Sequence, residues 1–240
     1  MNRTALITGA AIRIGNVIAR TLARAGWNVV VHAHRSVTEA DALCADLAAG
    51  GARAWRVTGD LADDGGPAAV FEAGIACAGQ IDALINNAAV FERQPLASAT
   101  AADFERLWRI NTLAPILLTQ RLAAHVTARK ACGSAVNLLD QRLSRASAGA
   151  LPYMLSKSAL ETFTLSAALE YAPDLRVNAV APGAVLPPPA QSGTKEPAGA
   201  FPLGTRPAAE HVAAAVRFLL DAESVTGQVL FVDGGQHLTS

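Results

Sequence analysis

Apolar runs of strand length alternate with amphipathic segments of helix length along almost the whole chain. The apolar runs predict β-strands near residues 3–8, 27–33, 53–58, 81–86, 134–139, 175–181 and 228–232. The segments between them predict helices near 14–25, 38–49, 66–78, 101–130, 150–171 and 208–221. Alternating strands and helices of this kind are typical of a parallel sheet that helices cover on both faces. The pattern therefore predicts an α/β fold with a doubly wound, seven-stranded parallel sheet.

The length of the chain favours one domain. A chain of 240 residues can bury a substantial core, so we expect a single domain over 1–240. The proline-rich run 187–197 follows neither the helical nor the strand period, and we predict a substrate loop near 184–206. In the helix predicted over 101–130, Thr100 is placed to cap the first turn and Pro115 to bend the axis.

The composition gives no sign of a charged partner or of a membrane. The 20 basic and 20 acidic residues balance, so no net field draws the protein to nucleic acid or to an anionic membrane. The chain has no visible signal segment and no apolar run of the roughly 20 residues that span a bilayer, so we expect a cytoplasmic protein. Cys44, Cys77 and Cys132 are far apart in the sequence, which predicts buried free thiols and no disulfide or metal site.

A glycine-containing turn, Thr8-Gly9-Ala10-Ala11-Ile12-Arg13-Ile14-Gly15, joins the first predicted strand to the first predicted helix. A turn in this position directs backbone N–H groups and the positive end of the helix toward a pyrophosphate. Gly9 permits a close approach, and Gly15 lets the helix pack on the strand. Arg13 and Ile14 replace the middle glycine of the common fingerprint, so an ordinary strand-to-helix turn remains the alternative.

The end of the second predicted strand indicates which dinucleotide is bound. Sites for the unphosphorylated cofactor usually place an acidic residue here, about 20 residues past the glycines. This chain has His34-Arg35-Ser36 instead, and the Arg35 guanidinium suits a 2′-phosphate that Arg13 could also approach. We therefore predict NADPH/NADP+ as the cofactor. The alternative is that Arg35 is a solvated loop cation.

Two further strand ends carry polar residues. Asp60-Leu61 follows the third predicted strand, where an adenine amine could be held, and Asn87-Ala88 follows the fourth, beside the expected nicotinamide ribose. Ligands of such sheets lie beyond the carboxyl ends of the strands, which favours cofactor binding at both places. The alternatives are an Asx turn and a helix cap.

Tyr153 and Lys157 are four residues apart in a predicted helix and so share one face. An ammonium group near a phenol favours the phenolate, which predicts a lowered pKa for Tyr153 and a role in proton transfer. The alternative is a chance pairing on an exposed helix face.

Together these motifs resemble the short-chain dehydrogenase/reductase family over essentially the whole chain. The matching segments are Thr8-Gly9-…-Gly15, Asp60-Leu61, Asn86-Asn87-Ala88, Asn111, Tyr153-…-Lys157, Pro182-Gly183 and Val232-Asp233-Gly234-Gly235. The resemblance implies a single-domain Rossmann fold in which Tyr153 donates a proton and Lys157 orients the nicotinamide ribose. It also implies that Asn111 holds a water in a proton relay and that Pro182 and Gly183 adjoin the nicotinamide.

The chain departs from the family 13 residues before the tyrosine, where most members have a serine and this chain has Asp140. A carboxylate is a poor donor to a carbonyl oxygen and would repel a developing alkoxide. It suits a nitrogen-rich heterocycle, because it can bind an amino-pyrimidine edge or help to protonate a ring nitrogen. We therefore expect Asp140 to lie within hydrogen-bonding reach of Tyr153.

The same departure resembles the pteridine reductase branch of the family. Arg13 and the run His34-Arg35-Ser36 match that branch, and Phe91 stands where it stacks a pterin against the nicotinamide. The resemblance implies a substrate site of Phe91, Asp140, Tyr153 and Arg13. Phe91 could instead be a core residue, and Ala89 replaces a serine that is common in the branch.

The sequence thus predicts an NADPH-dependent reductase that transfers hydride to a C=N bond of a pterin, a dihydropterin or a dihydrofolate-like compound. One alternative is a carbonyl reductase of the same family, acting on a 3-oxoacyl thioester or a small ketone. Another is a cofactor-binding regulator without turnover. The helices predicted over 101–130 and 150–171 are more apolar than one core face requires, and the resemblance implies a homotetramer.

Overall fold

A seven-stranded parallel sheet forms the centre of the protein in the computed structural model, which describes residues 3–144, 148–186 and 201–239. Its strands are β1 (Thr4–Ile7), β2 (Asn28–Ala33), β3 (Ala54–Thr58), β4 (Ala83–Asn86), β5 (Gly133–Leu138), β6 (Leu175–Pro182) and β7 (Val229–Val232). They lie in the order β3-β2-β1-β4-β5-β6-β7, and every neighbouring pair is parallel. The predicted doubly wound Rossmann fold is confirmed.

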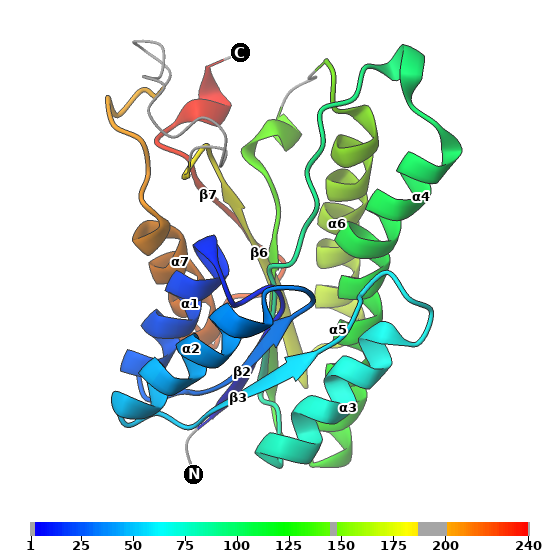
Figure 1. Ribbon diagram of the computed structural model, residues 1–240. Helices are drawn as coiled ribbons and strands as arrows, with labels where there is room; N and C mark the ends of the chain where they lie inside the picture. The colour runs from blue at the N-terminus through cyan, green and yellow to red at the C-terminus, as the bar shows by residue number, and fades with distance from the viewer. Residues whose placement is uncertain (1–2, 145–147, 187–200, 240) are drawn as a thin grey trace.

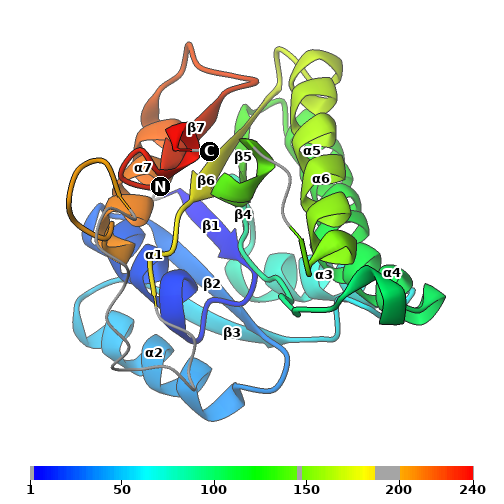
Figure 2. The ribbon, with the colours of Figure 1, turned by 90° about the horizontal axis from the view of Figure 1, so that it is seen from above.

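Helices cover both faces of this sheet (Figures 1 and 2). The helices are α1 (Arg13–Arg24), α2 (Val37–Ala49), α3 (Gly66–Ala78), α4 (Ala101–Trp108), α5 (Ala114–Ala128), α6 (Leu151–Glu170) and α7 (Ala209–Asp221). Helices α1, α2 and α7 lie on one face and α3 to α6 on the other. Each face has its own large apolar cluster against the strands, which accounts for the apolar character of both sides of each central strand.

The sheet reverses its winding between β1 and β4, which lie side by side. Strands β1, β2, β4 and β5 are buried along their whole length, whereas the edge strands β3 and β7 are partly exposed. At such a reversal the connecting loops leave in opposite directions and open a crevice beyond the carboxyl ends of the strands. The predicted site residues follow these ends.

The single helix predicted over 101–130 is wrong. The structure has two α-helices there, separated by a π-helical turn, η2 (Arg109–Leu113). Thr100 caps α4 as predicted, because its hydroxyl accepts from the backbone N–H of Asp103. Pro115 stands in the first turn of α5, where a missing N–H costs no helical hydrogen bond, so the irregularity lies before the proline.

The prediction of buried thiols is also wrong: Cys44 and Cys77 are half-buried and Cys132 is exposed. Within the described ranges, no helix has both the length and the apolar character needed to cross a bilayer. Most of the predicted substrate loop near 184–206 lies outside the described residues, because 187–200 are not among them. Val185 and Phe201, close to the two described ends of that loop, are buried.

Candidate active site

The glycine turn after β1 has a backbone conformation that residues with a side chain rarely adopt. Gly9 has φ of 61°, and Arg13, although not a glycine, has φ of 56°. A Cβ atom on Gly15 would lie 2.3 Å from the Gly9 carbonyl oxygen and 2.6 Å from the Asn87 side-chain nitrogen. The start of α1 is therefore packed against the turn so closely that only glycine fits.

A cavity of about 370 Å³ lies beyond the ends of β1, β2, β3 and β4. It is lined by Gly9, Ile12, Arg13, Ile14, Gly15, His32, His34, Asp60, Leu61, Asn87, Ala88, Ala89, Val90 and Ile110. Nine of these residues were predicted to bind the cofactor: Gly9, Arg13, Ile14, Gly15, His34, Asp60, Leu61, Asn87 and Ala88. The glycine turn and the three other strand ends thus meet around one hollow, as the motif spacing requires.

We call His34, Arg35 and Ser36 the phosphate clamp, because they are predicted to hold a 2′-phosphate. The clamp lines an adjoining hollow of about 500 Å³. Arg35 and Ser36 lie on its wall together with His34, and Gly9 and Asp60 are shared with the first cavity. Arg35 is exposed, so its guanidinium can reach a bound anion. The end of β2 therefore provides a basic rim and no carboxylate of its own.

His32, which the sequence reasoning did not assign to the site, holds the glycine turn in place. Its Nδ1 accepts from the backbone N–H of Gly9 at 3.2 Å, and its Nε2 lies 3.1 Å from the carbonyl oxygen of Gly59. These contacts require the neutral ring with the proton on Nε2. Burial lowers the pKa of His32 to about 4, which keeps the ring neutral at physiological pH. A polar residue directly after the apolar run Val29-Val30-Val31 of β2 was the available signal.

The end of β4 is bonded to the same turn. The Thr8 hydroxyl accepts from the backbone N–H groups of Asn87 and Ala88, both at 3.0 Å. In return, the Asn87 side chain donates to the carbonyl oxygens of Thr8 and Gly9 at 2.8 and 3.0 Å. Asn87 therefore lines the cavity and also fixes the backbone of the turn.

Asp140 and Tyr153 form a hydrogen-bonded pair beyond the end of β5. The Tyr153 hydroxyl donates to Asp140 Oδ2 at 2.9 Å, which confirms the predicted proximity. Tyr153 lies in the first turn of α6 and is 5% exposed. Burial and the neighbouring carboxylate raise the pKa of Tyr153 well above its ordinary value, so the predicted lowering by Lys157 is wrong. The phenol is held in its protonated form.

Lys157 lies one turn further along α6 and is buried. Its ammonium donates to the Leu138 carbonyl oxygen at 2.6 Å, at the end of β5. Burial lowers the pKa of Lys157 to about 8, and the charge of Asp140 only partly opposes this. A buried lysine with so few partners is costly for the fold, which is typical of a group retained for function.

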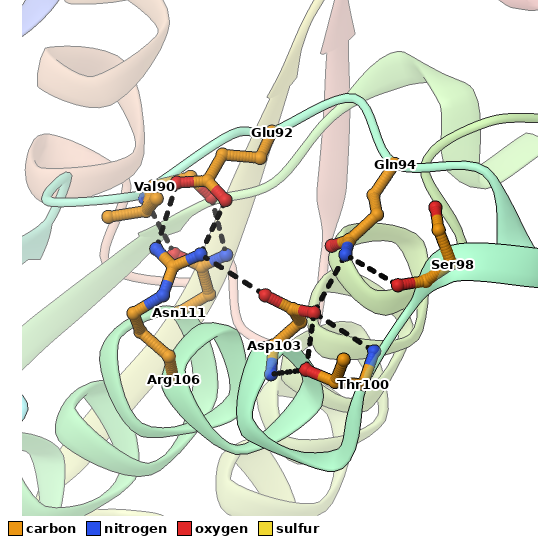
Figure 3. Close-up of polar contacts among 8 residues, drawn as sticks. All are labelled: Val90, Glu92, Gln94, Ser98, Thr100, Asp103, Arg106 and Asn111. Atoms are coloured by element: carbon orange, nitrogen blue, oxygen red, sulfur yellow. Dashed lines mark hydrogen bonds and ion pairs between the residues drawn. The ribbon is translucent and has the colours of Figure 1, made fainter.

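Asn111 points inward from the π-helical turn and is fully buried (Figure 3). Its Oδ1 accepts from the backbone N–H of Val90, and its Nδ2 donates to the carbonyl oxygen of Val90, both at 2.9 Å. The same Nδ2 lies 3.1 Å from the Ser156 hydroxyl. The side chain thus ties the segment after β4 to α6 beside Lys157, while the predicted relay water stays a prediction.

Phe91 and Arg142 complete the surroundings of the Asp140–Tyr153 pair. The rings of Phe91 and Tyr153 meet edge to face at 4.9 Å, and Phe91 is 44% exposed, so the alternative of core packing is wrong. The Arg142 guanidinium lies 4.9 Å from the centre of the Phe91 ring and 3.4 Å from Asp140 Oδ2. The backbone N–H of Arg142 also donates to Asp140, at 2.9 Å. The sequence reasoning missed Arg142, although it stands only two residues after the carboxylate.

Pro182 and Gly183 lie at the end of β6, as predicted. A Cβ atom on Gly183 would lie 2.7 Å from the Asp233 side chain, so glycine permits the tight approach of the segment after β7. Asp233 is buried and accepts from the backbone N–H groups of Gly235 and His237. The end of β6 is therefore firmly held, but neither Pro182 nor Gly183 lines the two cavities described above.

The described residues thus form two groups, a cofactor-type crevice and the hydrogen-bonded pair of Asp140 and Tyr153. Val90 and Phe91 connect them, because Val90 lines the crevice and Phe91 contacts Tyr153. No group of three or more His, Cys, Asp and Glu side chains in the described ranges is arranged to hold a metal ion. The side chains therefore offer a proton donor and a proton acceptor beside a crevice that is lined by the residues predicted to bind a dinucleotide.

Comparison with known proteins gives relatives over nearly the whole chain. Residues 9–237 match the family model described as enoyl-(acyl carrier protein) reductase. L-xylulose reductase of Mesocricetus auratus is 35% identical, covering 97% of this chain and 96% of that protein. Pteridine reductase 1 of Leishmania tarentolae is 34% identical, covering 98% and 96%. The crystal structure of FolM alternative dihydrofolate reductase 1 from Brucella suis, in complex with NADP, is 32% identical with a TM-score of 0.90, covering 99% of this chain and 96% of that one.

Proposed function

Because the chain belongs to the short-chain dehydrogenase/reductase family, we propose that it is a pteridine reductase-like enzyme that reduces a C=N bond of a pterin, a dihydropterin or a dihydrofolate-like compound. The chain is an oxidoreductase of this family, and its cofactor is NADPH/NADP+. The observation that carries the proposal is the 2.9 Å hydrogen bond between the Tyr153 hydroxyl and the carboxylate of Asp140.

The crevice fits a phosphorylated dinucleotide. Glycine at position 15 lets the start of α1 pack against the turn, so that both line one cavity in which a pyrophosphate could lie. Arg35 and Ser36 on the basic rim would hold the 2′-phosphate, and Asp60 with Leu61 would hold the adenine. NADPH, when bound, supplies the hydride.

The protein's own side chains would then supply and direct the proton. The raised pKa of Tyr153 keeps its proton on the phenol, from where it can pass to a substrate nitrogen. Asp140 accepts the phenolic hydrogen bond and can also bind an amino group next to that nitrogen. Phe91 offers an apolar ring face beside the pair, and Arg142 opposes the charge of Asp140. Lys157 would orient the nicotinamide ribose.

A second candidate is a carbonyl reductase of the same family, which the name of the L-xylulose reductase relative favours. The Asp140 carboxylate would stand beside the substrate oxygen in such an enzyme. Because the alkoxide that develops there is also negative, the two charges would repel one another at short range. For this reason we place the carbonyl reductase second, and a cofactor-binding regulator without turnover third.

A panel of NADPH oxidation assays separates the candidates. We expect turnover with dihydrobiopterin or dihydrofolate and none with an acetoacetyl thioester. Asp140→Ser should abolish the pterin activity, whereas Tyr153→Phe should abolish either chemistry. Turnover of the thioester alone, unaffected or raised in Asp140→Ser, would assign the protein to the carbonyl reductases, and cofactor binding without any turnover would assign it to the regulators.

We further propose that the enzyme is a cytoplasmic homotetramer. The exposed apolar side chains Leu155, Leu165 and Leu169 on α6 and Trp108 at the end of α4 support a covering subunit. Sedimentation equilibrium measures the subunit number directly, and a monomer at micromolar concentration would contradict this part of the proposal.

A further inference from the structure

The segment that carries Phe91 is tied to α4 and to the π-helical turn at alternate positions, through the backbone of Val90 and the side chains of Glu92 and Gln94. We call residues 90–94 the strap. Val90 makes two hydrogen bonds to Asn111, Glu92 makes a forked ion pair with Arg106, and Gln94 donates to Asp103 Oδ2 at 2.7 Å (Figure 3). The strap is thus fastened at three successive points along one helical face.

The alternation directs Phe91 away from α4. In an extended segment, side chains at alternate positions point to opposite sides. Because Glu92 and Gln94 both point to α4, Phe91 points the other way, and its ring lies against Tyr153 and Arg142. The same bonds that fasten the strap therefore set the side on which the ring lies.

The far end of the strap is anchored to the start of α6. The backbone N–H of Gln94 donates to the Gly149 carbonyl oxygen at 2.7 Å, and Gln94 forms a parallel bridge with Ala150. Ala150 directly precedes α6, whose first turn contains Tyr153. Phe91 and Tyr153 are therefore held in one connected unit.

Asp103 is a fixed anchor point at the start of α4. Its carboxylate accepts from the backbone N–H and the hydroxyl of Thr100 as well as from Gln94. These hydrogen bonds lower the pKa of Asp103 to about 2, so the carboxylate stays ionised at any pH at which the enzyme would work. The strap is thus fastened to a rigid, charged helix end.

The ion pair at the centre of the strap contributes geometry more than stability. Glu92 and Arg106 are both substantially exposed, and exposed pairs contribute little to the free energy of unfolding. A forked contact between a guanidinium and a carboxylate nevertheless restricts both side chains to one plane and one distance. Breaking it should therefore leave the fold intact and loosen the strap.

We infer that Glu92 and Arg106 are positioning residues that act through the strap to hold Phe91 against Tyr153 and so determine the affinity for a flat, aromatic substrate. The nature of that substrate rests on the function proposed above. Neither residue needs to touch the substrate, because the side chain that contacts Tyr153 is the ring of Phe91.

The test uses Arg106→Gln and Glu92→Gln in the full-length protein. We expect a 3- to 10-fold higher KM for a dihydropterin with a smaller change in kcat, and faster amide hydrogen exchange in residues 88–96. The charge-swapped double variant Glu92→Arg with Arg106→Glu should restore both values to within about twofold of the wild type. Arg121→Gln is the matched control, because it breaks another exposed ion pair, with Glu72 at 2.9 Å, away from the site.

Two results would overturn the inference. The first is that Arg106→Gln and Arg121→Gln give the same KM and the same exchange in residues 88–96. The second is that the NADPH dissociation constant rises while KM stays constant, since Glu92 and Arg106 also line the hollow of the phosphate clamp. Turnover of carbonyl compounds alone would refute the proposed function. The role of the strap would still be decided, because hydrogen exchange needs no substrate and KM can be measured with the carbonyl compound.

Discussion

His32 makes the stability of the protein depend on pH. The neutral ring accepts from the backbone N–H of Gly9 and lies against the carbonyl oxygen of Gly59, and it can do the first only while Nδ1 carries no proton. Protonation would turn an acceptor into a donor that faces another donor. We therefore expect the glycine turn to loosen as the pH falls.

The size of the effect follows from the pKa of His32. Its folded value of about 4 is below the ordinary 6.5, so the unfolded chain binds the proton more tightly than the folded one. The stability that this provides is complete above pH 6.5 and is lost as the pH falls toward 4. The full difference corresponds to about 3 kcal/mol, of which about 2 kcal/mol is lost between pH 7.5 and pH 5.

The assay compares the wild type with His32→Gln, whose amide can replace one acceptor and one donor without titrating. Urea unfolding at pH 7.5, 6.5, 5.5 and 5.0 should show the wild type losing about 2 kcal/mol more than the variant over this range. Carboxylates titrate in both proteins and cancel in the difference. Because His32 of the folded protein stays mostly neutral down to pH 5, calorimetric titration with NADPH over the same range should show the same pH dependence of affinity in both proteins. Parallel stability curves for the two proteins would refute the role assigned to His32.

Three substitutions test the other parts of the site. Lys157→Met should abolish turnover and raise the free energy of unfolding at pH 7 by about 1–3 kcal/mol, because it removes a buried ammonium group whose pKa is lowered to about 8. A variant that is less stable than the wild type in urea unfolding would contradict this expectation. Gly15→Ala should weaken NADPH binding at least roughly tenfold, because its Cβ would lie 2.3 Å from the Gly9 carbonyl oxygen. Unchanged affinity in calorimetry would contradict the role assigned to the glycine turn. Arg35→Asp should shift the preference for NADPH over NADH by about 2 kcal/mol, or roughly 30-fold in the ratio of kcat/KM; an unaltered ratio would place the phosphate elsewhere.

The parts of the site that sequence could predict are those set by chain direction and local spacing. Parallel strands place their ends along one edge, so residues that follow β1, β2, β3 and β4 had to meet, and they do. The distance of 13 residues from Asp140 to Tyr153 likewise spans the loop from the end of β5 to the first turn of α6. The first inference needs only element order and direction, whereas the second also uses the resemblance to the family.

The parts that sequence could not predict depend on depth and on long-range contacts. The four-residue spacing of Tyr153 and Lys157 is correct, but the pKa of Tyr153 is raised by burial and by Asp140, neither of which the spacing reveals. The contact of Glu92 with Arg106 joins residues 14 positions apart through an irregular segment. The apolar pattern over 101–130 is continuous, so it does not reveal the π-helical turn inside it.

That turn makes the length of this region as important as its composition. If one residue were deleted between Arg109 and Leu113, the helix could continue without interruption and would be locally more regular. Everything before the deletion would then rotate by about 100° relative to α5, which would carry Asp103 and Arg106 out of line with Asn111. Insertions and deletions at this place should therefore be far less tolerated during evolution than point changes. A redesign that makes the helix regular to raise its thermal stability would lower the activity of the enzyme.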